Sequence, residues 1–131
     1  MNCQLLFVYG TLRRGSARHA ILRRLGAEFI GEGSIRAELF DCGEWPGARK
    51  SAANHAQVAG EIYRLRNSAR ALKVLDKVEG FRPQVPEASL FTRETTEVVL
   101  LDGKQTPAWV YWLNRRFGPM RRIPSGDYAE I

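Results

Sequence analysis

The sequence predicts an α+β fold built on a curved antiparallel sheet or a small barrel. Three observations favour this class: strand-like segments dominate the chain, helical segments are few, and the links between strands are short. A length of 131 residues fits one domain, residues 1–131, and shares of 44% hydrophobic and 26% charged residues are ordinary for a globular protein. No linker, internal repeat or low-complexity segment divides the sequence.

The N-terminal segment predicts a strand, a turn and a helix in that order. Gln4–Tyr9 is a short apolar run rich in β-forming residues, which is typical of a buried strand, and Gly10 ends it. Thr11–Gly15 follows as a turn. Ser16 is placed to cap a helix over Ala17–Leu25.

The next segments predict two strands separated by a loop. Glu28–Phe40 alternates apolar and polar residues, and Gly31 and Gly33 interrupt the alternation, which indicates a strand with a bulge. Asp41–Gly47 has the composition of a loop. Gln57–Leu65 is again strand-like.

Ser68–Val78 is the clearest helical segment of the sequence. Ser68 is a good N-cap residue and Gly80 a good stop. At about 100° per residue, Ala71, Val74, Leu75 and Val78 share one face, which Leu72 widens. The other side holds Arg70, Lys73, Asp76 and Lys77.

The C-terminal third predicts a loop, a hairpin and a tail. Phe81–Ser89 contains two prolines and is expected to be a loop. Phe91–Leu101 and Pro107–Leu113 are strand-like and are joined through Asp102–Gly103, a hairpin signal, and the leading proline marks a strand end. The tail after Arg115 is expected to be irregular.

The sequence shows no signal for a membrane or an oxidising compartment. No apolar run approaches the ~20 residues needed to cross a bilayer, and Met1–Phe7 lacks the basic lead-in of a secretory signal. Cys3 and Cys42 are too few for a disulfide scaffold, and no Cys-X-X-Cys or histidine pair is present to hold zinc. We therefore expect reduced thiols, no metal and a cytoplasmic location.

The chain is basic, with a net charge of +6. Its arginines concentrate in two stretches without acidic residues: Arg13, Arg14, Arg18, Arg23 and Arg24, then Arg115, Arg116, Arg121 and Arg122. Such clusters attract polyanions or anionic substrates, but they most often form a solvated face. Because the sequence lacks a nucleic-acid recognition motif and interleaved stacking aromatics, we do not expect nucleic acid as a partner.

Glu79 is a carboxylate on the apolar side of the predicted helix. On the helical wheel it falls between Leu72 and Leu75, where Gly80 ends the helix. A carboxylate facing the interior is desolvated, which raises its pKa toward the range useful for proton transfer. If the last helical turn unwinds instead, Glu79 lies in water and has no such role.

The turn formed by Tyr9, Gly10, Thr11 and Leu12 follows the first predicted strand. Turns of this kind expose consecutive backbone N–H groups, which bind a carboxylate or a developing oxyanion. The glycine spacing matches neither a phosphate-binding loop nor a dinucleotide fingerprint. A glycine turn after a strand is common, so the turn by itself does not predict a binding site. It indicates one only in combination with Glu79.

Several motifs occur in a definite order, and a Tyr-Gly-Thr-Leu turn with a later Leu-Asp-X-X-Glu-Gly is specific as a pair. The motifs are Tyr9–Gly15 (YGTLRRG), His19 and Leu22, Asp41–Gly47 (DCGEWPG), Val58–Tyr63 (VAGEIY), Leu75–Gly80 (LDKVEG) and Ser125–Tyr128 (SGDY). Over nearly the whole chain this arrangement resembles the γ-glutamylcyclotransferase-like family, most closely its AIG2-like and γ-glutamylaminecyclotransferase branch.

The resemblance implies a small closed mixed β-barrel with a few flanking helices and a cavity at one end. It also implies that the α-amino group of a small γ-glutamyl substrate attacks its own γ-carbonyl, so that 5-oxoproline forms and an amine or amino acid leaves, with no metal or cofactor. Glu79 aligns with the family's catalytic glutamate. Tyr9, Gly10, Thr11 and Leu12 align with its substrate-holding turn.

The sequence departs from the family pattern at positions that concern substrate choice. Phe91 stands before Thr92 and Arg93 where the branch commonly has tyrosine, and Trp45 stands where an aromatic, often tyrosine, is expected. Tyr111 is a candidate hydroxyl donor, although an aromatic residue of the barrel wall is the favoured interpretation. The alternative function is a non-catalytic small-metabolite-binding protein on the same fold. Neither the leaving amine nor the oligomeric state follows from the sequence.

Overall fold

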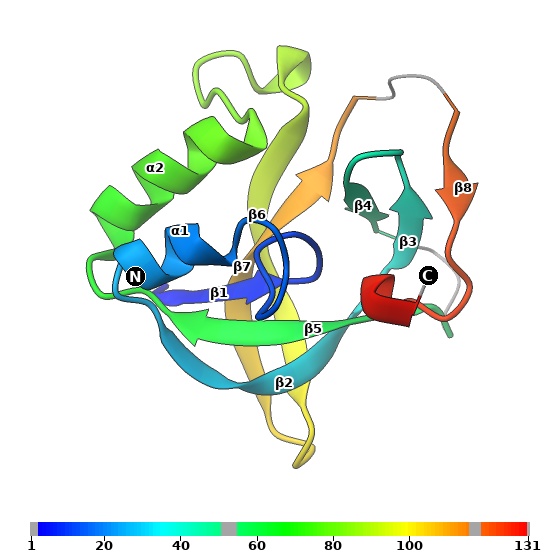
Figure 1. Ribbon diagram of the computed structural model, residues 1–131, viewed down its shortest axis with the longest axis horizontal. Coiled ribbons are helices and arrows are strands. Elements are labelled where there is room, and N and C mark those ends of the chain that lie inside the picture. Colours follow the sequence, from blue (N-terminus) through cyan, green and yellow to red (C-terminus); the bar gives the residue numbers. More distant parts are fainter. Residues whose placement is uncertain (1–2, 51–54, 116–118, 131) are drawn as a thin grey trace.

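The computed structural model describes residues 3–50, 55–115 and 119–130. Strands β1 (Leu5–Val8), β5 (Gln57–Arg64), β2 (Glu28–Arg36), β6 (Phe91–Leu100) and β7 (Gln105–Leu113) close into a barrel in that spatial order (Figure 1). Paired strands are antiparallel except β1 and β7, which run parallel. The closed, mixed barrel confirms the predicted fold class.

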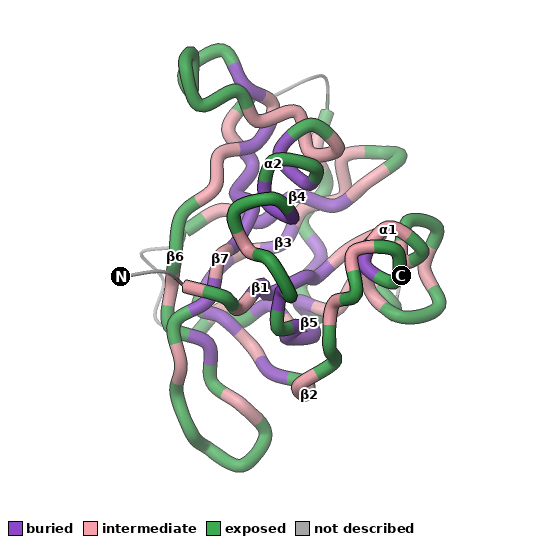
Figure 2. The backbone as a smooth tube through the Cα atoms, turned by 90° about the vertical axis from the view of Figure 1, so that its left-hand side faces the viewer, coloured by how far each residue is buried: buried purple, intermediate pink, exposed green. Residues whose placement is uncertain are grey.

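Strand β1 is buried on both faces, which explains its uninterrupted apolar sequence. Phe7 belongs to the hydrophobic cluster inside the barrel, with residues such as Ile62 and Val110 from other strands. Its neighbours Leu6 and Val8 belong to a second cluster that includes residues of both helices. Alternate residues therefore serve the two clusters. Figure 2 shows this buried centre, with exposed backbone at the β6–β7 hairpin.

Helices α1 (His19–Arg24) and α2 (Ser68–Glu79) lie on one side of the barrel, near β1 (Figure 1). The side chain of Asn67 accepts a hydrogen bond from the Arg70 N–H and caps α2, so the cap is Asn67 rather than the predicted Ser68. Gly80 ends the helix with φ of 69°, a left-handed conformation that glycine adopts without steric strain. This confirms the predicted stop.

The prediction that Ser16 caps a helix from Ala17 is wrong, because α1 begins at His19. The preceding residues form successive turns instead. Within them the Arg18 N–H donates to the carbonyl of Thr11 at 2.8 Å, which folds the segment back on itself. Gly15, which lies just before the predicted cap Ser16, adopts a φ of 80°, so no helix runs through this position.

A small second sheet contains β3 (Glu38–Asp41), β4 (Pro46–Arg49) and β8 (Arg121–Arg122), in the order β4-β3-β8. The prediction of a loop over Asp41–Gly47 is therefore wrong at both ends of that range. The predicted irregular tail likewise contributes β8. A register shift between Phe29 and Gly31 confirms a bulge in β2, but the predicted long strand divides into β2 and β3.

The remaining segments follow the sequence closely. The turn of the β6–β7 hairpin contains Gly103 at φ of 88°, as its Asp-Gly signal predicts. The predicted proline-rich loop contains the short 3₁₀ helix η1 (Pro86–Ala88), and a second, η2 (Tyr128–Glu130), lies near the C-terminus. Pro107 is the third residue of β7 and lies near its start.

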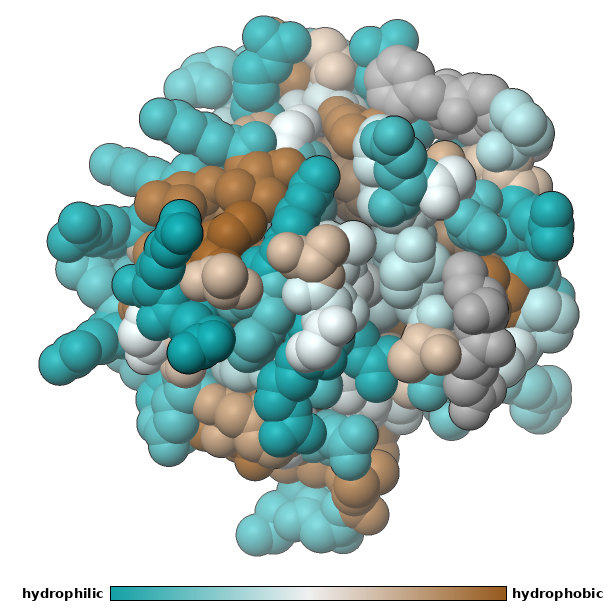
Figure 3. All heavy atoms as spheres, in the orientation of Figure 1, coloured by the Kyte–Doolittle hydropathy of each residue, from teal (hydrophilic) through white to brown (hydrophobic). Residues whose placement is uncertain are grey.

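Hydrophilic side chains cover much of the face in Figure 3. Arg23 and Arg24 from the first arginine stretch are exposed, as are Arg121 and Arg122 from the second, whereas Arg116 lies outside the described residues. Among the residues that the structure describes, no helix is long and apolar enough to span a membrane.

Candidate active site

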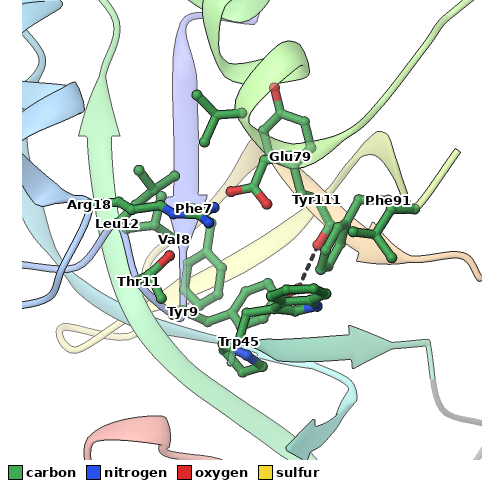
Figure 4. A pocket seen from close by; sticks show the side chains of 14 residues that line it. Phe7, Val8, Tyr9, Thr11, Leu12, Arg18, Trp45, Glu79, Phe91 and Tyr111 are labelled. Carbon is green, nitrogen blue, oxygen red and sulfur yellow. Dashed lines mark hydrogen bonds between the residues drawn. The ribbon is translucent and has the colours of Figure 1, made fainter. Parts of the chain in front are cut away.

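A pocket of about 90 Å³ opens where the turn after β1 meets the C-terminal end of α2 and the β3–β4 connection (Figure 4). Buried residues with large apolar side chains form its inner wall: Phe7, Val8, Tyr9, Leu12, Phe91 and Tyr111. The remaining wall includes less buried residues, namely Gly10, Thr11, Arg18, Trp45, Val78, Glu79 and Leu90. The predicted turn and the predicted glutamate thus line one cavity.

Glu79 is the last residue of α2 and extends into the pocket (Figure 4). Its carboxylate forms no hydrogen bond or ion pair with any residue that the structure describes. Burial raises the pKa of Glu79 from its ordinary value of 4.5 to about 7, and the positive charge of Arg18 partly opposes this rise. A carboxyl group with that pKa can both accept and donate a proton near neutral pH.

The turn across the pocket presents unused backbone donors. The N–H groups of Gly10, Thr11 and Leu12 have no hydrogen-bond acceptor among the described residues. Gly10 packs against Pro46 so closely that a Cβ at this position would lie 2.5 Å from the proline Cγ. Glycine therefore allows the turn to reach the pocket wall. The free donors are suited to bind a carboxylate or an oxyanion.

The side chain of Tyr9 holds the pocket wall together. Its buried hydroxyl donates to the backbone oxygen of Tyr111 at 2.7 Å and accepts from the N–H of Ala48 at 3.0 Å. Burial raises the pKa of Tyr9 far above its usual range. The phenol is thus neutral and fully hydrogen-bonded, so Tyr9 can serve a ligand through its backbone rather than through its hydroxyl.

A buried acid, Glu61, fixes the turn to the barrel. Its carboxylate accepts hydrogen bonds from the backbone N–H of Arg14 at 2.9 Å and from the hydroxyl of Tyr63 at 3.0 Å. The neighbouring Arg13 forms an ion pair of 2.8 Å with Asp127 near the C-terminus. These contacts hold the turn in place from two sides, and the anchoring roles of both acids were not predicted from the sequence.

Asp76 is buried, although the helical wheel places it with charged residues on the side opposite the apolar face. Arg93 donates to both of its carboxylate oxygens, at 2.8 and 3.2 Å, and the hydroxyl of Tyr111 donates to it at 2.6 Å. The guanidinium of Arg93 also lies over the ring of Trp109, 4.5 Å from its centroid. This network joins α2 to β6 and β7 one helical turn before Glu79, and thereby orients the end of the helix.

The aromatic residues that depart from the family pattern lie in the pocket wall. Phe91 and Trp45 both line the cavity. Tyr111 lines it too, but its hydroxyl is bonded to Asp76, so its ring is the part presented to the pocket. Arg18 also lines the cavity, which the sequence analysis did not predict because it placed this residue inside a helix.

The described residues contain no group of three or more His, Cys, Asp or Glu side chains arranged to hold a metal ion. The pocket combines Glu79, which has no bonded partner in the described part of the chain, with the backbone donors of the turn and with apolar walls. This arrangement can move a proton and stabilise negative charge on a small organic molecule.

Comparisons with known proteins agree on one family. The family model described as "Gamma-glutamyl cyclotransferase, AIG2-like" matches residues 6–130. A protein of Vibrio cholerae with the provisional name γ-glutamylcyclotransferase is 31% identical over 131 residues, covering 96% of this chain and 96% of its own length.

Solved structures share the fold at comparable identity. An AIG2-like protein of Mus musculus superposes with a TM-score of 0.71 at 26% identity, covering 91% of this chain and 82% of that protein. YkqA of Bacillus subtilis superposes with a TM-score of 0.75 at 26% identity, covering 97% of this chain but only 40% of that protein. The chain therefore corresponds to less than half of that larger relative.

Proposed function

Because the chain belongs to the AIG2-like γ-glutamyl cyclotransferase family, we propose that it cyclises the γ-glutamyl part of a γ-glutamyl amine or amide to 5-oxoproline and releases the amine. One observation carries this proposal. The carboxylate of Glu79 has no partner among the described residues and shares a pocket with the free backbone donors of the turn at Gly10.

In the proposed reaction Glu79 moves the proton. Its carboxylate takes a proton from the α-ammonium group of the substrate, and the freed amine attacks the γ-carbonyl carbon to form a new C–N bond. Glu79 gives that proton to the departing nitrogen and takes a second proton from the attacking nitrogen, so the old C–N bond breaks and leaves a neutral lactam. The second proton then passes to the released amine, which departs as an ammonium ion, and Glu79 is again a carboxylate. Because the carboxyl group accepts and donates one proton at a time, a single group with a pKa of about 7 is sufficient.

The turn and the apolar wall would hold the substrate for this step. The N–H groups of Gly10, Thr11 and Leu12 bind the α-carboxylate or polarise the γ-carbonyl, and both roles engage the glutamyl half. The ring closure is intramolecular, so the pocket contributes mainly by folding the glutamyl chain until its amine faces its carbonyl. Phe91 and the ring of Tyr111 would enclose the methylene carbons.

The test is release of 5-oxoproline from a panel of γ-glutamyl amines, amides and amino acids. We expect release from at least one compound and a loss of roughly 10²–10⁴-fold in kcat for Glu79→Gln, the range typical of a general acid–base group. Glu97→Gln, the same change at an exposed position on β6, is the matched control and should retain full activity. Calorimetric binding without turnover would instead favour a metabolite-binding protein.

A further inference from the structure

The turn after β1 exposes N–H groups because its own backbone oxygens are all occupied. The oxygens of Gly10 and Thr11 accept from backbone N–H groups later in the same segment, at 3.1 and 2.8 Å. The oxygen of Leu12 accepts from Nδ1 of His19 at 2.9 Å. These three bonds shape the segment and leave its N–H groups to face the pocket, but none of them connects the turn to a barrel strand.

Glu61 provides that connection from strand β5. It is the register partner of Val8, the last residue of β1, and therefore lies beside the point where the turn begins (Figure 1). Alternate residues of β5 serve opposite faces: Val58 and Ile62 belong to the cluster inside the barrel, whereas Tyr63 belongs to the cluster that includes the helices. By this alternation Glu61 lies on the side of the strand where the turn packs.

One oxygen of Glu61 makes most of the connection. Its Oε1 accepts from the backbone N–H of Arg14 at 2.9 Å and from the hydroxyl of Tyr63 at 3.0 Å. Its Oε2 has only the Nε of Arg14, at 3.4 Å, on a side chain that is 53% exposed. An ion pair with so exposed a partner contributes little, whereas any carbonyl oxygen at the position of Oε1 could accept the other two bonds. The connection therefore depends more on the reach of the side chain than on its charge.

We propose that Glu61 is a positioning residue for the site: its hydrogen bond to the Arg14 N–H holds the three free donors of the turn in the orientation that binds the glutamyl half of the substrate. This inference rests on the proposed function, which gives those donors their ligand. Glu61 is not among the residues that line the pocket, so it acts through the turn rather than on the substrate.

Loss of this bond should be seen first in substrate binding. Without it the Arg14 N–H has no acceptor and the turn can move away from β5. Donors that must first be ordered bind a ligand less tightly, because the cost of ordering them is then part of the binding free energy. Glu79 lies on α2 and is oriented by the separate network of Asp76. We therefore expect KM to rise by more than kcat falls, with no change in the pH midpoint of kcat.

Two substitutions separate the reach of the side chain from its charge. Glu61→Gln keeps the length and an acceptor oxygen but removes the charge, whereas Glu61→Asp keeps the charge but is one methylene shorter. Binding of γ-glutamyl-methylamide is measured by calorimetry in a Glu79→Gln background, where the ligand is not consumed. We expect Glu61→Asp to weaken binding at least about tenfold and Glu61→Gln to weaken it less than about threefold.

Glu32 supplies the matched control. It is the register partner of Glu61 on β2, but its side chain is exposed, so Glu32→Asp should leave binding unchanged. Circular dichroism establishes that each variant is folded. If Glu61→Asp does not fold, Glu61→Ala takes its place, because it removes the same contact without burying a charge, and the same tenfold loss is expected.

Equal losses for Glu61→Asp and Glu61→Gln would overturn the inference, because charge rather than reach would then hold the turn. Unchanged binding in Glu61→Asp would also contradict it, because the donors would not depend on this anchor.

Failure of the proposed function has a separate signature, because the turn can be observed without a ligand. If γ-glutamyl-methylamide binds but no γ-glutamyl compound is cyclised, the proposed function fails and the binding data still decide the inference. If it does not bind at all, the amide ¹H–¹⁵N NMR signals of Gly10, Thr11 and Leu12 decide it. They should shift strongly in Glu61→Asp and little in Glu61→Gln, and equal shifts or none would overturn the inference.

Discussion

Asp76 and Glu79 are acids one turn apart on α2, and their surroundings are opposite. Asp76 is buried with both oxygens occupied, by the guanidinium of Arg93 and the hydroxyl of Tyr111. Glu79 faces a cavity with no partner among the described residues, and burial raises its pKa to about 7. A carboxylate with bonded partners fastens the helix, whereas one without them can exchange its proton.

The difference shows that one helix carries both an acid held by partners and an acid that faces a cavity. The Asp76 network fixes the direction of α2, and Glu79 follows at the next turn, where Gly80 ends the helix. The Asp76 network therefore positions the residue that we propose as the general base. Removing the charge of Asp76 should therefore lower the free energy of unfolding, whereas removing the charge of Glu79 should raise it.

Removal of the Asp76 charge should have the largest effect on stability. Asp76→Asn leaves the largely but not fully buried guanidinium of Arg93 without its counter-charge, and we expect the free energy of unfolding to fall by about 3 kcal/mol. Urea unfolding monitored by circular dichroism measures this. Glu94→Gln, which breaks the exposed pair with Lys50, is the control and should cost less than about 1 kcal/mol. A similar cost for both variants would show that the network does not hold α2.

Removal of the Glu79 charge should stabilise the protein, but only at higher pH. The folded state raises the pKa of Glu79, so the folded chain holds its proton more tightly than the unfolded chain does. Stability therefore falls as pH rises from about 4.5 to 7, by up to about 3 kcal/mol. Glutamine does not ionise, so the Glu79→Gln protein does not lose this stability. It should be more stable than the parent protein at pH 8 and equally stable at pH 4.

The measurement is urea unfolding of both proteins at the two pH values. A Glu79→Gln protein that is less stable at pH 8 would mean that the carboxylate has stabilising partners, contrary to the structure. Persistence of the stability gain at pH 4 would point to packing rather than charge as its cause.

Loss of a single hydrogen bond to Asp76 should have the smallest effect. Tyr111→Phe removes the hydroxyl but leaves the bidentate contact of Arg93, so the cost is expected to be about 1–2 kcal/mol. Thermal unfolding measures it. The ring that lines the pocket is retained, so the KM for substrate should change little. If the orientation of Glu79 depends on this hydrogen bond, the pH dependence of kcat should shift. If Tyr111→Phe lowered the free energy of unfolding as much as Asp76→Asn, the stabilisation would come from the tyrosine hydrogen bond rather than from Arg93.

The sequence predicts those features that depend on local pattern. The apolar run of β1, the hairpin signal at Gly103 and the stop at Gly80 each reflect a conformational requirement of a few neighbouring residues. The inward position of Glu79 follows from helical spacing once that stop is correct. The motif pair then indicates the family, and the family resemblance predicts the closed barrel.

Features that depend on distant partners could not be predicted in this way. A helical wheel places Asp76 among charged neighbours, and only the fold brings Arg93 and Tyr111 to it. The proline and glycine that begin β4 have loop character, and only pairing with β3 makes them a strand. Arg18 was missed because the turns before α1, rather than a helical repeat, direct it to the pocket.

The most direct test of the account is the pKa of Glu79 itself. Carboxyl ¹³C NMR titration of the free protein, with Glu79→Gln used to assign the resonance, measures it without reference to any substrate. We expect a midpoint at about 7, with kcat/KM for 5-oxoproline release rising through the same pH range as the carboxylate forms. A midpoint near 4.5 would contradict it, because a solvated or paired Glu79 could not serve as the base proposed here.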